Sequence, residues 1–128
     1  MPSSVPPWRY GVALFPLAPL ASLGSTAGTR LFFGLSLRGH AGETEALAAV
    51  LAFLLSAVLS WAGVVVALLV IAALVLDARA LRRGDAAFSP QPALAALLGF
   101  VHLAASALPP LYVFSVPPLG YYTYRRFA

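Results

Sequence analysis

The chain has 128 residues, of which 61% are hydrophobic and only 9% are charged, and its mean hydropathy is +0.90. A domain of this length has too little interior to bury so much apolar surface, so these values exclude an ordinary soluble globule and predict an all-α integral membrane protein. The lack of cysteine excludes disulfides and thiolate chemistry, and the net charge of +4 comes from eight arginines placed beside apolar segments, which favours lipid headgroups over nucleic acid as partner.

The first predicted span lies near residues 10–37. Trp8, Arg9 and Tyr10 have the composition of a membrane boundary, and nineteen uncharged residues, 11–29, follow them. Pro16 and Pro19 each remove a helical hydrogen bond, so we expect a kinked helix. Three interpretations stay open from position 30 onward: the helix continues past Arg30, residues 30–38 turn along the interface as a separate helix, or the segment is a signal peptide with small residues at positions 25–27.

A long helix is predicted after the polar link of residues 38–45. Gly42 or Thr44 can cap its start, and Gly84 follows its expected last residue, Arg83. Residues 46–76 contain no charge and would rise about 46 Å, which exceeds the roughly 30 Å of bilayer hydrocarbon. We therefore expect a second span near residues 46–76, with one end covered either by headgroups around its alanines or by a neighbouring protein.

Arginines at positions 79, 82 and 83 fall on one helical face and can meet lipid phosphates, so the loop of residues 77–91 is predicted to be cytoplasmic. The third predicted span, near residues 92–120, contains two proline pairs and is expected to bend. It would place Arg125 and Arg126 at the opposite headgroups, with the N-terminus inside and the C-terminus outside. A hairpin at the prolines is the alternative, and it gives a fourth apolar arm, but each arm would be too short to cross.

Small side chains form stripes on the predicted helices, and such stripes let membrane helices pack closely. The long helix carries Ala48, Ala52, Ser56, Ser60 and Gly63, the last helix carries Ala95, Gly99, His102 and Ser106, and the first carries Gly24 and Gly28. The stripes predict either a self-contained bundle or a surface for a partner subunit.

His102 is the one titratable residue near the middle of a predicted span, which makes it and Arg30 a candidate intramembrane polar site. A neutral imidazole that binds a serine or a carbonyl freed by a proline would explain His102 without any reaction. His40, Glu43 and Glu45 share a short polar segment, but we predict no metal and no cofactor, and no catalytic motif occurs.

The C-terminal half contains Asp77-Ala78-Arg79-Ala80-Leu81-Arg82, then Phe88-Ser89-Pro90, and ends with Tyr122-Thr123-Tyr124-Arg125-Arg126. This series resembles small uncharacterised multi-pass membrane proteins of halophilic archaea, in which a D-A-R-x-x-R turn precedes an aromatic-x-Pro start and a Y-x-Y-R-R ending. Phe88 departs from the pattern, in which tryptophan is more usual. The resemblance implies a membrane location and no particular activity.

Together these features predict a single transmembrane domain over residues 1–128, located in the cell membrane with multiple passes. The expected function is that of a non-enzymatic accessory or structural subunit, which binds membrane lipids and either another membrane subunit or itself. A small transporter or proton conduit that uses His102 is the alternative.

Overall fold

The computed structural model describes residues 7–37 and 42–128, and this part of the chain is helical without strands. The helices are α1 (Trp8–Val12), α2 (Leu17–Leu37), α3 (Glu43–Arg83), α4 (Pro92–Ala104), the short 3-10 helix η1 (Pro109–Leu111) and α5 (Tyr112–Phe127). Two helical segments, Trp8–Ser36 and Glu43–Arg83, are long and apolar enough to cross a membrane. The predicted all-α class is therefore confirmed. His40, which was considered as a metal ligand, lies outside the described residues.

The bend expected from Pro16 and Pro19 lies between α1 and α2. Phe15 N–H donates to the Val12 carbonyl at 3.0 Å and Leu17 N–H donates to the Leu14 carbonyl at 3.0 Å, which is the tighter spacing of a 3-10 turn. Pro16 and Pro19 have no N–H, so the regular α-helical ladder cannot pass through this point. Beyond the bend, α2 continues past Arg30 without a break, as the first of the three interpretations predicted.

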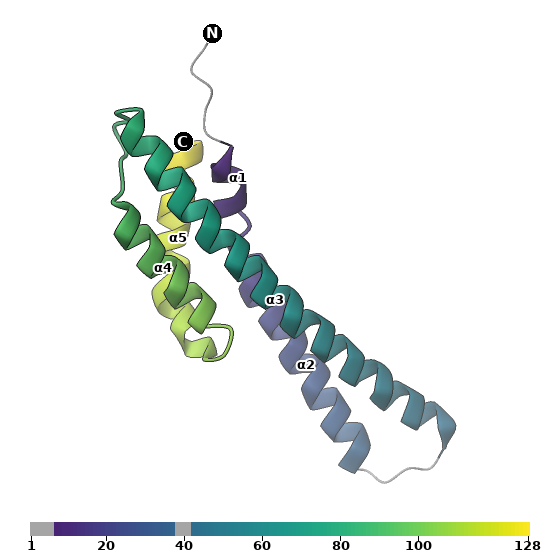
Figure 1. The fold of residues 1–128 in the computed structure, drawn as a ribbon. Coiled ribbons are helices and arrows are strands. Elements are labelled where there is room, and N and C mark those ends of the chain that lie inside the picture. Colours follow the sequence, from purple (N-terminus) through teal and green to yellow (C-terminus); the bar gives the residue numbers. More distant parts are fainter. Residues whose placement is uncertain (1–6, 38–41) are drawn as a thin grey trace.

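Helix α3 has 41 residues and forms the long axis of the molecule (Figure 1). It begins after an extended Gly42 and ends in a Schellman motif, in which Ala86 N–H donates to the Leu81 carbonyl at 3.2 Å. Gly84 was expected to supply the special backbone conformation of this stop. The left-handed residue is instead Asp85, with φ of 51°.

The predicted third span is wrong, because the chain reverses direction between α4 and α5 (Figure 1). Leu108 precedes a proline and adopts φ −125° and ψ 82°, outside the helical region, and the proline pair that follows supplies no N–H to continue α4. The arms have 13 and 16 residues, so each is only about 20–24 Å long. The C-terminus consequently lies at the same end as the loop of residues 84–91, not at the opposite end as predicted.

Helix α3 organises the packing of the other helices. Helices α1, α4 and α5 surround its C-terminal half, whereas α2 runs beside its N-terminal half (Figure 1). The apolar core lies in the four-helix end and consists of Val12, Phe15, Val70, Ala73, Leu74, Ala78, Ala95, Leu119 and Tyr122. We call the part made by α2 and the N-terminal half of α3 the two-helix arm.

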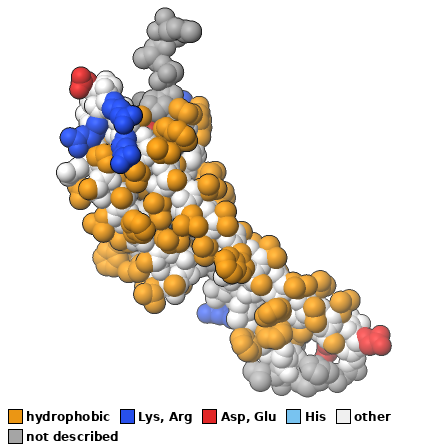
Figure 2. Space-filling model, viewed as in Figure 1, with side chains coloured by type: hydrophobic (Ala, Val, Ile, Leu, Met, Phe, Trp, Pro, Cys, Tyr) orange, Lys and Arg blue, Asp and Glu red, His pale blue; other side chains and the backbone are white. Residues whose placement is uncertain are grey.

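The surface is dominated by large apolar side chains, whereas small and polar ones lie inside. Leu23, Val58 and Trp61 are 68%, 64% and 71% exposed, and Asp77, His102 and Ser115 are fully buried. Figure 2 shows hydrophobic side chains over most of the visible face, with most of the visible basic side chains gathered at one end and one farther along the molecule. So many exposed large apolar side chains, together with buried polar ones, are unusual for a water-soluble globule.

Candidate functional site

Asp77, Tyr122 and Arg126 form a buried ionic cluster, which we call the Asp77 cluster. Arg126 donates from Nε to Oδ2 of Asp77 at 2.7 Å and from Nη2 to Oδ1 at 3.0 Å, and the Tyr122 hydroxyl donates to Oδ2 at 2.8 Å. Tyr122 and Arg126 are four residues apart, so one face of α5 presents both groups to α3. The two-pronged guanidinium contact is the strong form of an ion pair, and it fastens the end of α5 to α3.

Arg9 and Arg125 extend this network toward the surface. Arg9 Nη1 donates to the Arg126 carbonyl at 3.4 Å, and its guanidinium lies 4.7 Å from the Phe127 ring centroid. Arg125 donates to the Tyr121 hydroxyl at 2.9 Å and lies 4.8 Å from the Phe88 ring centroid. These contacts connect α1, α5 and the loop after α3 at one end of the bundle.

His102 occupies a second buried site, at the bend between α1 and α2. Its Nε2 lies 3.0 Å from the Phe15 carbonyl, and its Nδ1 lies 2.9 Å from Oγ of Ser115. A carbonyl only accepts, so Nε2 carries the hydrogen and the neutral ring accepts from the Ser115 hydroxyl at Nδ1. The Phe15 carbonyl is open because its partner four residues later is Pro19, so His102 replaces a hydrogen bond that the proline removed.

A third polar group joins α2 to α3 in the two-helix arm. Ser25 and Ser56 exchange hydrogen bonds with each other's carbonyls at 3.1 and 3.0 Å, and Thr29 Oγ1 lies 2.6 Å from Ser56 Oγ. A Cβ on Gly28 would lie 3.1 Å from the Ala52 carbonyl, so glycine is needed for the two backbones to come this close. The hydroxyl groups of these three residues thus face the helix interface.

The small-residue stripes are largely used inside the chain. Ala52, Gly63, Ala95 and Gly99 are buried, Ala48, Ser56 and Ser106 are half-buried, and Ser60 is exposed. A Cβ on Gly99 would lie 2.8 Å from Cγ1 of Ile71, and one on Gly63 would lie 3.4 Å from Ala21. The buried positions therefore serve the self-contained bundle, which was one of the two interpretations.

The proposed polar pair of His102 and Arg30 is not brought together. Arg30 is exposed on α2, and no hydrogen bond or ion pair connects it to His102 in the described chain. Arg79, Arg82, Arg83 and Arg125 are exposed, as headgroup binding requires. Arg126 differs from that expectation, because its guanidinium is held by Asp77 and its side chain is only 9% exposed.

Sequence reasoning missed the Asp77 cluster and the Ser115 and Ser25 contacts. One local signal was present, since an aspartate directly after thirty-one uncharged residues is costly unless it is paired. The spacing of Tyr122 and Arg126 was a second signal. In residues 7–37 and 42–128, no three His, Asp or Glu side chains gather as a metal site.

No family model, curated protein or solved structure matches this chain. The resemblance to halophilic archaeal membrane proteins therefore stays a prediction from the quoted motifs.

Proposed function

We propose that the chain is a non-enzymatic integral membrane protein that serves as an accessory or structural subunit. The observation that carries the proposal is the distribution of side chains, with a surface dominated by large apolar groups and with paired polar groups buried beside the apolar core. Acyl chains are as apolar as leucine, so this surface is stable in lipid, and close backbone packing replaces the hydrophobic effect within the bundle.

In this proposal the segment Trp8–Ser36 and helix α3 cross the bilayer, and the α4–α5 hairpin enters from one face and returns to it. The hairpin arms are too short to cross about 30 Å of hydrocarbon, which supports a re-entrant form. Its polar atoms are directed to protein, since His102 and Ser115 bind each other and Arg126 binds Asp77.

Charge supports one orientation. Arg9 and Arg125 lie at the same end as the exposed arginines near the end of α3, whereas Glu43 and Glu45 begin α3 at the other end. Positively charged segments stay on the cytoplasmic side, so we infer that α1, the end of α5 and the loop of residues 84–91 face the cytoplasm. This replaces the earlier expectation of a C-terminus outside.

The partner surface in this proposal is the two-helix arm. Helix α3 rises about 61 Å, roughly twice the hydrocarbon thickness, and only α2 accompanies its N-terminal half. Phe53, Leu55, Val58 and Trp61 are each at least half exposed there, and Trp61 at 71% is not a core residue. A neighbouring membrane subunit or a second copy of the chain would cover this arm.

Site-specific photo-crosslinking in native membranes tests the role. A photoreactive phenylalanine analogue at position 61 is expected to give one discrete protein adduct. The same analogue at position 100 is the control, because Phe100 is 58% exposed on α4 in the four-helix end. Lipid adducts alone at both positions would contradict the subunit role.

The transporter alternative receives no support from the His102 geometry. Both ring nitrogens already have protein partners, and the apolar core separates the ring from the Asp77 cluster. A histidine that relays protons needs an exchanging partner at both ring nitrogens; the Ser115 hydroxyl at Nδ1 can exchange a proton, but the Phe15 carbonyl at Nε2 cannot.

A further inference from the structure

The turn between α4 and α5 leaves backbone carbonyls without helical partners. The residues four positions after Ala105 and Ser106 are Pro109 and Pro110, which have no N–H to donate. The N–H groups of Ala107 and Leu108 both donate to the Ala104 carbonyl, at 3.1 and 3.0 Å, and so do not satisfy these two carbonyls. Inside a bilayer such groups need a partner from protein or water.

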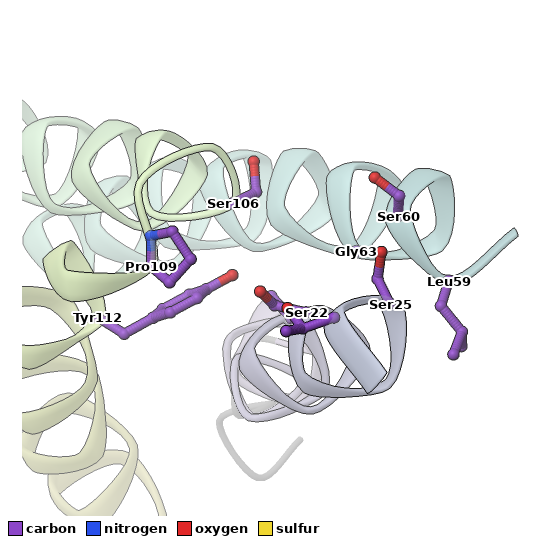
Figure 3. A pocket seen from close by; sticks show the side chains of 10 residues that line it. Ser22, Ser25, Leu59, Ser60, Gly63, Ser106, Pro109 and Tyr112 are labelled. Atoms are coloured by element: carbon purple, nitrogen blue, oxygen red, sulfur yellow. The ribbon is translucent and has the colours of Figure 1, made fainter. Parts of the chain in front are cut away.

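A cavity of about 110 Å³ lies beside this turn (Figure 3). Six hydroxyl-bearing side chains line it, three from α2, one from α3, one from the turn and one from the start of α5: Ser22, Ser25, Thr26, Ser60, Ser106 and Tyr112. No charged side chain lines it. The Tyr112 hydroxyl points across the space toward Ser22, and it is buried without a hydrogen-bond partner among the described residues.

We propose that this cavity holds a cluster of water molecules, which hydrogen-bond to the Tyr112 hydroxyl, to the other hydroxyl groups of the lining and to the open carbonyl of Ser106, and so allow the hairpin to end inside the bilayer. The proposal rests on the membrane location proposed above. A buried water needs two to four polar partners and occupies about 30 Å³, and this cavity provides both the partners and room for about three. The uncharged lining suits a neutral ligand rather than an ion.

A groove of about 390 Å³ adjoins the cavity. It shares Ser25 and Ser60 with the cavity and continues along the two-helix arm to Thr29 and Ser56. On the side of the cavity away from the groove, the Tyr112 ring packs edge-on against the His102 ring, with 5.4 Å between the ring centroids. Phe15 of the apolar core lies next to His102. The cavity therefore adjoins the groove of the two-helix arm on one side and the His102 site on the other.

The lack of native cysteine permits a direct test in liposomes with single-cysteine variants. Ser22→Cys places a thiol in the cavity, and the matched control Val113→Cys places one beside Tyr112 on a surface that is 72% exposed to lipid. A small membrane-permeant methanethiosulfonate reaches both thiols. Its rate of reaction with each thiol then depends on the fraction present as thiolate, and a thiolate forms only where water is present. We expect the Ser22→Cys thiol to react at least about tenfold faster.

Equal, slow rates at both positions would show a dry cavity and overturn the proposal. Fast rates at both positions would show water on the outer surface as well, which would contradict the membrane location itself. The two failures are therefore distinguishable.

Tyr112→Phe gives an independent test, because the direction of its effect on stability depends on whether the cavity holds water. With water present, loss of the hydroxyl removes hydrogen bonds and lowers the folded-to-unfolded ratio about three- to tenfold. In a dry cavity the same change removes an unsatisfied group and raises the ratio, which would overturn the proposal. Tyr124→Phe, at a side chain 67% exposed, is expected to leave the ratio unchanged.

Discussion

The Asp77 cluster predicts a large loss of stability when Arg126 is replaced by methionine. Arg126 makes two hydrogen bonds to Asp77, at 2.7 and 3.0 Å, and the two side chains are 9% and 0% exposed. Methionine keeps much of the volume but leaves the carboxylate with Tyr122 alone. Removal of one partner from a buried ion pair costs about 3–5 kcal/mol, so we expect Arg126→Met to lower the free energy of unfolding by that amount.

Reversible unfolding in bicelles, followed by circular dichroism, measures this change. Arg125→Met is the matched control, because the neighbouring arginine is exposed and its contacts with Phe88 and Tyr121 are worth about 1 kcal/mol or less. Combining Arg126→Met with Asp77→Leu removes both charges, and an apolar pair in place of a buried ion pair is often neutral. The double variant should therefore be more stable than Arg126→Met alone.

Equal losses for the variants at positions 125 and 126 would refute the reasoning. Simple additivity of the two changes in the double variant would refute it as well, since it would mean that Asp77 and Arg126 do not interact energetically.

Three further changes have defined outcomes in the same unfolding assay. Gly99→Ala places a Cβ 2.8 Å from Ile71 and should cost about 1–3 kcal/mol, whereas Gly34→Ala meets no atom within 4 Å and should be neutral or slightly stabilising. Asp85→Gly removes a side chain from the left-handed position, φ 51°, and should stabilise by about 0.5–1 kcal/mol. His102→Ala strands the Phe15 carbonyl and the Ser115 hydroxyl and should cost about 3–5 kcal/mol, while proteoliposomes keep wild-type proton permeability.

Each of these has a contrary result. Equal effects at Gly99 and Gly34 would contradict the close crossing of α3 and α4. Destabilisation by Asp85→Gly would mean that the carboxylate has a role beyond the turn. A change in proton flux with unchanged stability in His102→Ala would favour the transporter alternative.

The long elements could be predicted from local sequence. Residues 46–76 carry no charge, and Gly42 and Gly84 flank the helix as expected. The bend near Pro16 and the continuation past Arg30 were also foreseen, since both depend on backbone donors and on the apolar residues nearby.

The choice between a bent span and a hairpin could not be made locally. Pro109 and Pro110 permit either a bent span or a hairpin. The bent span was preferred because each arm of a hairpin is too short to cross the bilayer. The hairpin is held by partners distant in sequence: Arg126 and Asp77 are separated by 49 residues, and His102 reaches a carbonyl 87 residues away. The arginines before and after residues 92–120 suggested that the two ends of this segment lie at opposite membrane faces. Arg126, however, pairs with the buried carboxylate of Asp77.

Side-specific labelling of single cysteines tests the central claim most directly, namely that the chain is inserted in a bilayer and that a re-entrant hairpin places the C-terminus on the same side as the loop of residues 84–91. With sealed right-side-out vesicles and an impermeant maleimide, the account predicts labelling of Thr44→Cys and protection of Ala87→Cys and Ala128→Cys until the vesicles are opened. Labelling of Ala128→Cys from outside together with Thr44→Cys would mean that the last segment crosses the bilayer, and it would contradict the hairpin. Labelling of all three positions in sealed vesicles would contradict insertion itself.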